Sequence, residues 1–224
     1  MTESPKFNHI DGDYIIALNF LARILQEPPS KQFLLQMRPL CTQIFAWPGA
    51  SSDLVPTLQA ELEKDLPSLA DALAEEHARL FTGPSPVVPL WESVWVERDK
   101  LLFGAKTLQV EELFADWNLA NGNPDREPLD HLGFELGFLA WLMDLAENDS
   151  RERSHSGHAP EDSSKALFNI HINAFAPQVL KKVSEETTSN FYKIIAQNGL
   201  KMLETLNSVF KISPHSRPEA TDAE

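Results

Sequence analysis

Three carboxylates and a histidine gather in one short stretch of the sequence, between residues 127 and 135. The carboxylates are Glu127, Asp130 and Glu135, and His131 stands four residues before Glu135. On a helix, a spacing of four places two side chains on one face. Such a pair suits a metal site, an acid–base pair or a hydrogen-bonded groove. One histidine beside a carboxylate is too small a ligand set for zinc, so no metal or other cofactor is expected.

Carboxylates also suit a cationic partner, because a guanidinium group binds a carboxylate through two parallel hydrogen bonds. Glu92 adds a further carboxylate beside Trp91, and Trp95 follows four residues after Trp91. The alternative is structural. Glu127 or Asp130 then accepts hydrogen bonds from free N–H groups at a helix start, and both tryptophans pack in the core. We expect Trp91 to contact a ligand and Trp95 to pack.

Other signals of catalysis are absent from the sequence. Neither glycine-rich phosphate-binding pattern occurs, and there is no Gly-x-Ser-x-Gly elbow. Cys41 lies in an apolar helical context, where a buried and inert thiol is expected. His155 and His158 follow Glu152 in a polar stretch rich in Ser, Gly and Asp, which is typical of a solvated loop. The chain is therefore not expected to be an enzyme.

Helical periodicity dominates the chain, so helices must position these side chains. Asp13, Ser30 and Ser68 are the expected N-caps of the first helices. The most apolar helix, at 128–147, is expected at the centre of the core. No stretch alternates with period two for long enough to build a sheet. We predict an all-α, single-domain helical bundle over residues 1–212 with a disordered tail at 213–224, and helices near 13–27, 30–45 with a break at Pro39, 53–66, 68–80, 107–118, 128–147, 164–183 and 188–210.

The segment from residue 82 to residue 104 differs from the rest. Pro84, Pro86 and Pro89 prevent a regular helix, yet the segment is apolar and holds Trp91 and Trp95. A long connection of this composition is typical of a functional loop. A second polar segment, at 149–164, is expected to be a surface linker.

The totals exclude several classes of partner and site. The 224 residues carry a formal net charge of -14, which argues against nucleic acid and favours a basic peptide or protein. One cysteine excludes an internal disulfide. No stretch approaches the roughly 18 to 20 apolar residues of a membrane span, and the N-terminus lacks the pattern of a secretory signal. We expect a cytoplasmic protein without membrane insertion.

Two segments carry a combined pattern. The first is LFTGP at 80–84, followed by WESVW at 91–95 and LFG at 102–104. The second is EPLDHLGFELGFL at 127–139. Together they resemble the TorD/DmsD family of chaperones for molybdenum-containing redox enzymes. His171, Pro177 and the run at 190–192 are similar to the family's C-terminal pattern. The resemblance covers about residues 10–210 and is closer to the DmsD branch.

The resemblance implies an all-helical chaperone that binds the twin-arginine leader of a client redox-enzyme subunit in the cytoplasm until its cofactor is inserted. Such a leader presents two arginines and then an apolar stretch. The expected peptide-binding residues are Trp91, Glu92, Trp95, Glu127, Asp130, His131 and Glu135.

On this hypothesis, His131 orients Asp130 or lines the groove, and its protonation near neutral pH tunes binding. Asp130→Ala should weaken leader binding at least about tenfold with the fold intact.

Two alternatives stay open. One is an assembly factor for another cytoplasmic metalloprotein that recognises no leader. The other is a metal-dependent helical enzyme built on Asp130, His131 and Glu135. The expected oligomeric state is a monomer, and exchange of helices across the segment 149–164 would instead give a dimer.

Overall fold

The computed structural model describes residues 12–40, 47–119, 127–148 and 152–212. Cys41 and the predicted tail at 213–224 lie outside these residues. So do the last residues of the predicted helix at 30–45 and the start of the predicted linker at 149–164.

Most of the described residues lie in helices, which confirms the predicted all-α class. The described part of the chain contains no strand, only an isolated antiparallel bridge between Trp91 and His131. Two of the segments, η3 and η4, are π-helical. The elements are α1 (Gly12–Gln26), α2 (Lys31–Met37), η1 (Arg38–Leu40), η2 (Ser52–Leu54), α4 (Val55–Leu62), α5 (Leu66–His77), η3 (Ala78–Thr82), α6 (Glu92–Val96), α7 (Ala105–Asp116), α8 (Leu132–Glu147), α9 (Pro160–Ala166), η4 (Leu167–Ile172), α10 (Asn173–Glu186) and α11 (Asn190–Ile212).

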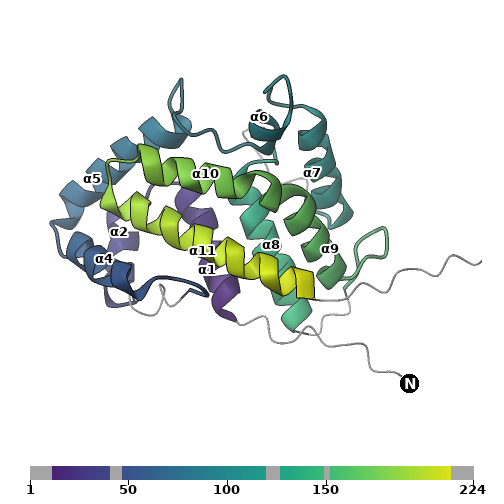
Figure 1. Ribbon diagram of the computed structural model, residues 1–224, viewed down its shortest axis with the longest axis horizontal. Coiled ribbons are helices and arrows are strands. Elements are labelled where there is room, and N and C mark those ends of the chain that lie inside the picture. The colour runs from purple at the N-terminus through teal and green to yellow at the C-terminus, as the bar shows by residue number, and fades with distance from the viewer. Residues whose placement is uncertain (1–11, 41–46, 120–126, 149–151, 213–224) are drawn as a thin grey trace, which may run out of the picture.

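Helix α8 lies at the centre of the core, as predicted from its composition. Leu132, Leu136, Leu139, Leu142 and Met143 are all fully buried. α8 packs along α1 on one side and against α9 and η4 on another. Figure 1 shows α10 and α11 side by side across the front, with α1 and α8 behind them, the short helices α2, α4 and α5 at one end and α6, α7 and α9 at the other.

The observed caps explain where two of the early helices begin. The Ser30 hydroxyl accepts from the backbone N–H of Phe33 and caps α2, as predicted. The predicted cap at Ser68 is wrong, because α5 already begins at Leu66 and Asp65 is its cap. Asp65 accepts from both the N–H and the hydroxyl of Ser68. These two bonds lower the pKa of the Asp65 carboxyl.

Helix α8 begins four residues later than predicted, at Leu132 and not at residue 128. His131 is its N-cap, and the Nδ1 atom of His131 accepts from the N–H of Gly133 at 3.1 Å. The preceding residues are extended because they pair with the segment around Trp91. Glu127 and Asp130 therefore do not lie in the first turn of α8, contrary to the predicted favourable position at that helix end.

The described part of the predicted surface linker is ordered against α7. Its α9 begins at Pro160, and Ser154 and Ser164 are buried. His155 is exposed but bonds the Asn118 side chain at 2.7 Å. The predicted helix at 164–183 is also interrupted, because η4 separates α9 from α10.

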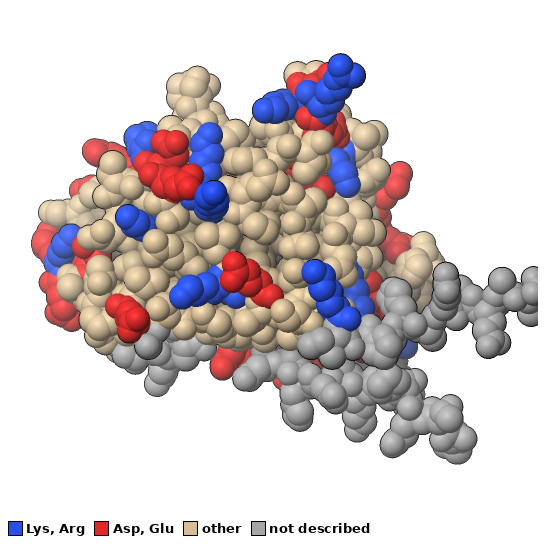
Figure 2. Space-filling view, viewed as in Figure 1, with Lys and Arg blue, Asp and Glu red and all other residues tan. Residues whose placement is uncertain are grey.

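The visible face in Figure 2 carries acidic and basic side chains in small mixed groups, separated by uncharged surface. No helix among the described residues is long and apolar enough to cross a membrane.

Candidate functional site

A short antiparallel pairing brings the two sequence motifs together. The N–H of Glu92 donates to the Asp130 carbonyl at 2.8 Å, and the N–H of Leu132 donates to the Leu90 carbonyl at 2.7 Å. These two bonds place Trp91 opposite His131. Immediately after the pairing, one of the two segments continues into α6 and the other into α8. The pairing therefore holds the first residues of both helices next to each other.

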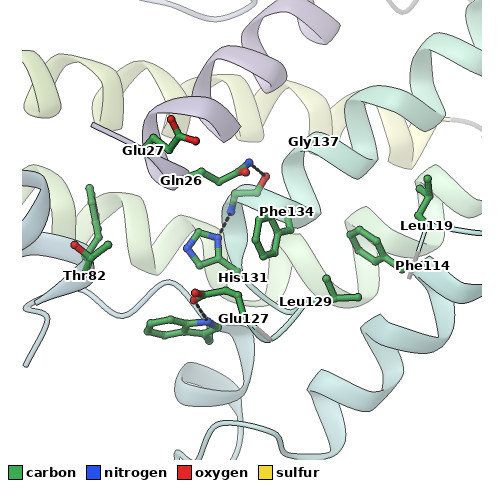
Figure 3. A pocket seen from close by; sticks show the side chains of 13 residues that line it. Gln26, Glu27, Thr82, Phe114, Leu119, Glu127, Leu129, His131, Phe134 and Gly137 are labelled. Atoms are coloured by element: carbon green, nitrogen blue, oxygen red, sulfur yellow. Dashed lines mark hydrogen bonds between the residues drawn. The ribbon is translucent and has the colours of Figure 1, made fainter. Parts of the chain in front are cut away.

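A pocket of about 680 Å³ opens beside this pairing (Figure 3). Its walls come from the end of α1, from η3, from the paired segments around Trp91 and His131, from α7 and Leu119 three residues beyond it, and from the first turns of α8. The lining is mainly apolar and aromatic, with two carboxylates and no described lysine or arginine. The lining residues are Gln26, Glu27, Phe81, Thr82, Trp91, Phe114, Leu119, Glu127, Leu129, His131, Gly133, Phe134 and Gly137.

Trp91, Glu127 and His131 form one wall of the pocket. The indole N–H of Trp91 donates to the Glu127 carboxylate at 3.1 Å. The Trp91 and His131 rings meet edge to face, with centroids 5.8 Å apart, and the His131 ring also contacts Phe134 at 5.1 Å. This wall offers an aromatic face, a carboxylate and an imidazole to one ligand.

His131 is neutral at physiological pH, contrary to the hypothesis that its protonation tunes binding near neutrality. Burial, with a smaller contribution from His77, lowers the pKa of His131 to about 4. The Nδ1 atom accepts from Gly133, so the proton of the neutral ring is on Nε2.

Asp130 is fully buried and links two other helices. Its Oδ2 accepts from the N–H of Ser93 at 2.9 Å, in the first turn of α6. Its Oδ1 accepts from the Thr107 hydroxyl at 3.1 Å, in the first turn of α7. The carboxylate thus caps α6, not the helix that follows it in sequence. This makes Asp130 a positioning residue for α6, α7 and the adjacent Trp91.

Glu92 is the centre of a buried polar group. Its carboxylate is fully buried, 2.8 Å from the Nδ1 atom of His171 and 3.3 Å from the Nζ atom of Lys106. His171 lies in η4, and a π-helical segment of this kind often marks a functional position. The contact ties the motif at 91–95 to the C-terminal pattern that begins at His171.

Glu135 is also fully buried, and neither of its carboxylate oxygens has a hydrogen-bond partner among the described residues. Burial, followed by the charges of Glu92 and Asp130, raises the pKa of Glu135 well above its usual range. Burial therefore disfavours the charged form of Glu135, which an ion pair with an arginine would require.

The seven predicted residues therefore divide into three groups. Trp91, Glu127 and His131 line the pocket. Trp95 was expected both to pack and to belong to the peptide-binding set; it packs against the core without lining the pocket, and its indole N–H donates to the Pro89 carbonyl at 2.8 Å. The remaining three carboxylates are buried and do not line the pocket; they are Glu92, Asp130 and Glu135.

Sequence reasoning missed the contribution of α1. Gln26 and Glu27 lie at its end, and the side-chain N–H of Gln26 donates to the Gly133 carbonyl at 3.0 Å. These residues are more than 100 positions from α8, so no local pattern connected them with the motif. Phe81 and Phe134 were also missed as lining residues. Both lie within the two sequence motifs, so their position in the motifs could have identified them.

Gly133 allows α1 to reach α8 at this point. A Cβ atom at residue 133 would lie 2.7 Å from the Gln26 Cγ atom and 3.0 Å from the Ala22 carbonyl oxygen. The glycine therefore permits the close approach that brings Glu27 to the pocket. Within the described residues, no group of three or more His, Cys, Asp or Glu side chains is arranged to hold a metal ion.

Curated relatives resemble this chain, and among them are two that are called Tat proofreading chaperone DmsD. The protein from Salmonella typhi is 29% identical over 128 residues, which are 57% of this chain and 56% of the relative. The protein from Salmonella typhimurium is 33% identical over an equally long stretch, again 57% of this chain and 56% of the relative. The chain thus spans little more than half the length of these relatives.

A solved structure supports the fold. The crystal structure described as a redox enzyme maturation protein from Archaeoglobus fulgidus has a TM-score of 0.53 with this chain at 21% identity. The similarity covers 91% of this chain and 99% of that one. The family model of the nitrate reductase delta subunit matches residues 47–181. Because the match includes more than half of the chain, the chain belongs to that family, the TorD/DmsD family that its two motifs resemble.

Proposed function

We propose that this chain is a cytoplasmic maturation chaperone and not an enzyme, and that its pocket binds the twin-arginine leader of a molybdenum-containing reductase subunit. Holding the leader delays export until the cofactor of the client is inserted. The relatives named as Tat proofreading chaperones support this role. The observation on which the proposal depends is the lining of the pocket, which combines carboxylates and aromatic rings without a described lysine or arginine.

The lining suits two adjacent guanidinium groups. Figure 3 shows Glu27 and Glu127 on either side of His131, one from α1 and one from the segment before α8. Each carboxylate can accept the paired N–H groups of one arginine. The Trp91 ring offers a face for cation–π contact, and a neutral His131 adds no opposing charge.

A pair of peptides tests the proposal by calorimetric titration of the full chain. One is a synthetic twin-arginine leader, and the other carries alanine at both arginines. We expect the first to bind at least about tenfold more tightly, because a desolvated arginine–carboxylate pair is costly to break. Equal binding of both peptides, or binding of neither, would contradict the proposal. In the latter case a pulldown would be used to identify a client that is recognised without a leader.

Glu27→Gln should weaken leader binding about two- to fivefold, a modest effect because exposed ion pairs are weak. Glu27 is 64% exposed in its side chain and pairs with Arg23, four residues earlier. The matched control is Glu185→Gln, since Glu185 is 62% exposed and pairs with Lys181 at the same spacing on α10. The same titration measures both variants. Equal weakening in both would indicate a general charge effect and remove Glu27 from the site.

A further inference from the structure

Exposed apolar side chains are concentrated in one part of the molecule. Of the ten large apolar side chains that are exposed in the described residues, six lie between residues 96 and 119. Scattered exposed leucines are ordinary, but a contiguous group marks an interaction site. The six are Val96, Leu101, Leu102, Phe103, Leu108 and Leu119.

Helix α7 connects this group to the pocket. Its exposed positions are Ala105, Leu108, Gln109, Glu112 and Ala115, and all of them except Gln109 follow a helical spacing of three and four. Leu119 follows the helix and lines the pocket, as does Phe114 from the inner face of α7. Three of the five exposed positions on the helix are apolar. An apolar track thus runs from the pocket along α7 to the preceding loop.

The loop before α7 is tied to the start of that helix by a hydrogen bond. The Glu97 carboxylate accepts from the N–H of Lys106 at 2.6 Å, in the first turn of α7. Lys100 and Phe103 have positive φ angles of 51° and 62°, a conformation that costs a non-glycine residue free energy. The loop keeps this shape although Leu101 and Phe103 are 64% and 63% exposed.

We infer that the α7 surface, formed by Leu101, Phe103, Leu108, Ala115 and Leu119, binds the apolar stretch that follows the two arginines of the leader. This inference rests on the proposed function. Once the arginines are in the pocket, the next part of the leader must leave it, and the apolar track begins at the pocket wall. The segment bound on the α7 surface is therefore part of the same peptide whose arginines bind in the pocket.

The length of the surface agrees with this occupant. The 12 residues of α7 correspond to about 18 Å of helix. An apolar leader region has roughly 7 to 15 residues, or about 10 to 22 Å if helical. An amphipathic or apolar helix laid along another helix is a common mode of peptide recognition.

The test titrates two peptides into full-length variants. One peptide is the whole leader, and the other keeps the two arginines but lacks the apolar stretch. Leu108→Gln should weaken binding of the whole leader about tenfold, the effect of losing one buried leucine. It should leave binding of the short peptide unchanged. The control is Ile16→Gln, because Ile16 is 55% exposed and Leu108 is 58% exposed, and it should bind both peptides like the wild type.

Three outcomes would overturn the inference. In the first, the wild type binds the whole leader, and Leu108→Gln and Phe103→Ser bind it equally well. This result would exclude the α7 surface from leader binding and leave the proposed function intact. Failure of the wild type to bind either peptide removes both. The third outcome is detected by sedimentation velocity, which measures the oligomeric state. A concentration-dependent dimer that Leu108→Gln abolishes, with leader binding unaffected, assigns the surface to a second copy of the chain.

Discussion

Asp130→Ala should lower the free energy of unfolding by about 3 kcal/mol, because it leaves two buried donors without an acceptor. These donors are the N–H of Ser93 and the hydroxyl of Thr107. Asp130 is fully buried, so water cannot replace the carboxylate without entering the core. The sequence-based expectation of an intact fold is therefore revised. Urea unfolding followed by far-UV circular dichroism measures the change.

Asp130→Asn is the matched variant. Its side-chain oxygen can accept from Ser93, and its amide can donate to the Thr107 hydroxyl, so most of the stability should return. If Asp130 acts by positioning α6 and Trp91, the Asn variant should also bind the leader nearly as well as the wild type. A stable Asp130→Ala protein that fails to bind the leader would instead indicate direct contact between Asp130 and an arginine.

The second large effect is a fall in stability as the pH drops from about 6.5 towards 4. The pKa of His131 is lowered from 6.5 to about 4 by burial. Between these two pH values, His131 is protonated in the unfolded chain but neutral in the folded protein. The stabilising contribution of His131 is complete above the unfolded pKa and is lost as the pH falls towards the folded one. Each pH unit corresponds to about 1.4 kcal/mol, so the whole interval is worth about 3 kcal/mol.

His131→Asn isolates this contribution. Asparagine is a good N-cap and can still accept from the N–H of Gly133, but it does not titrate. The midpoint of urea unfolding, measured from pH 7 to pH 4, should fall more steeply in the wild type than in the variant. His77 is also buried with a lowered pKa, and it titrates in both proteins, so the difference reports His131. Parallel curves would contradict the assignment.

The helices and the central position of α8 could be read from the sequence because they depend on local patterns. Apolar residues at spacings of three and four mark the buried face of a helix wherever it packs. Leu132, Leu136 and Leu139 follow this spacing on α8, and all three are buried. The all-α class and the family followed from the same local information, since the motifs at 80–104 and 127–139 are each continuous in the chain.

The caps were less predictable because several neighbouring residues could serve. Asp65 and Ser68 are both good capping residues within one turn of the same helix, and their mutual hydrogen bonds decided the start. The start of α8 depended on a distant partner. Extended pairing with the segment around Trp91 delays the helix until Leu132.

The chemistry of the acidic cluster was decided by the tertiary structure. The sequence identified carboxylates at 92, 127, 130 and 135 and an aromatic residue beside them, which was sufficient to indicate a cationic ligand. It could not distinguish an exposed carboxylate from a buried one, because burial depends on what packs over the side chain. Glu127 reaches the pocket, whereas Asp130 caps a helix that lies 37 residues earlier.

Long-range approach decided the rest of the site. Glu27 enters the pocket only because α1 packs closely along α8 at Gly133, and a contact across more than 100 residues leaves no trace in local spacing. The exposure of Leu108 and Phe103 likewise depends on which faces of α7 and its loop the core covers. The sequence by itself determined the residue types, the helices and the family. Which carboxylates line the pocket and which are buried within the fold was decided by packing, since desolvation is a property of the assembled structure.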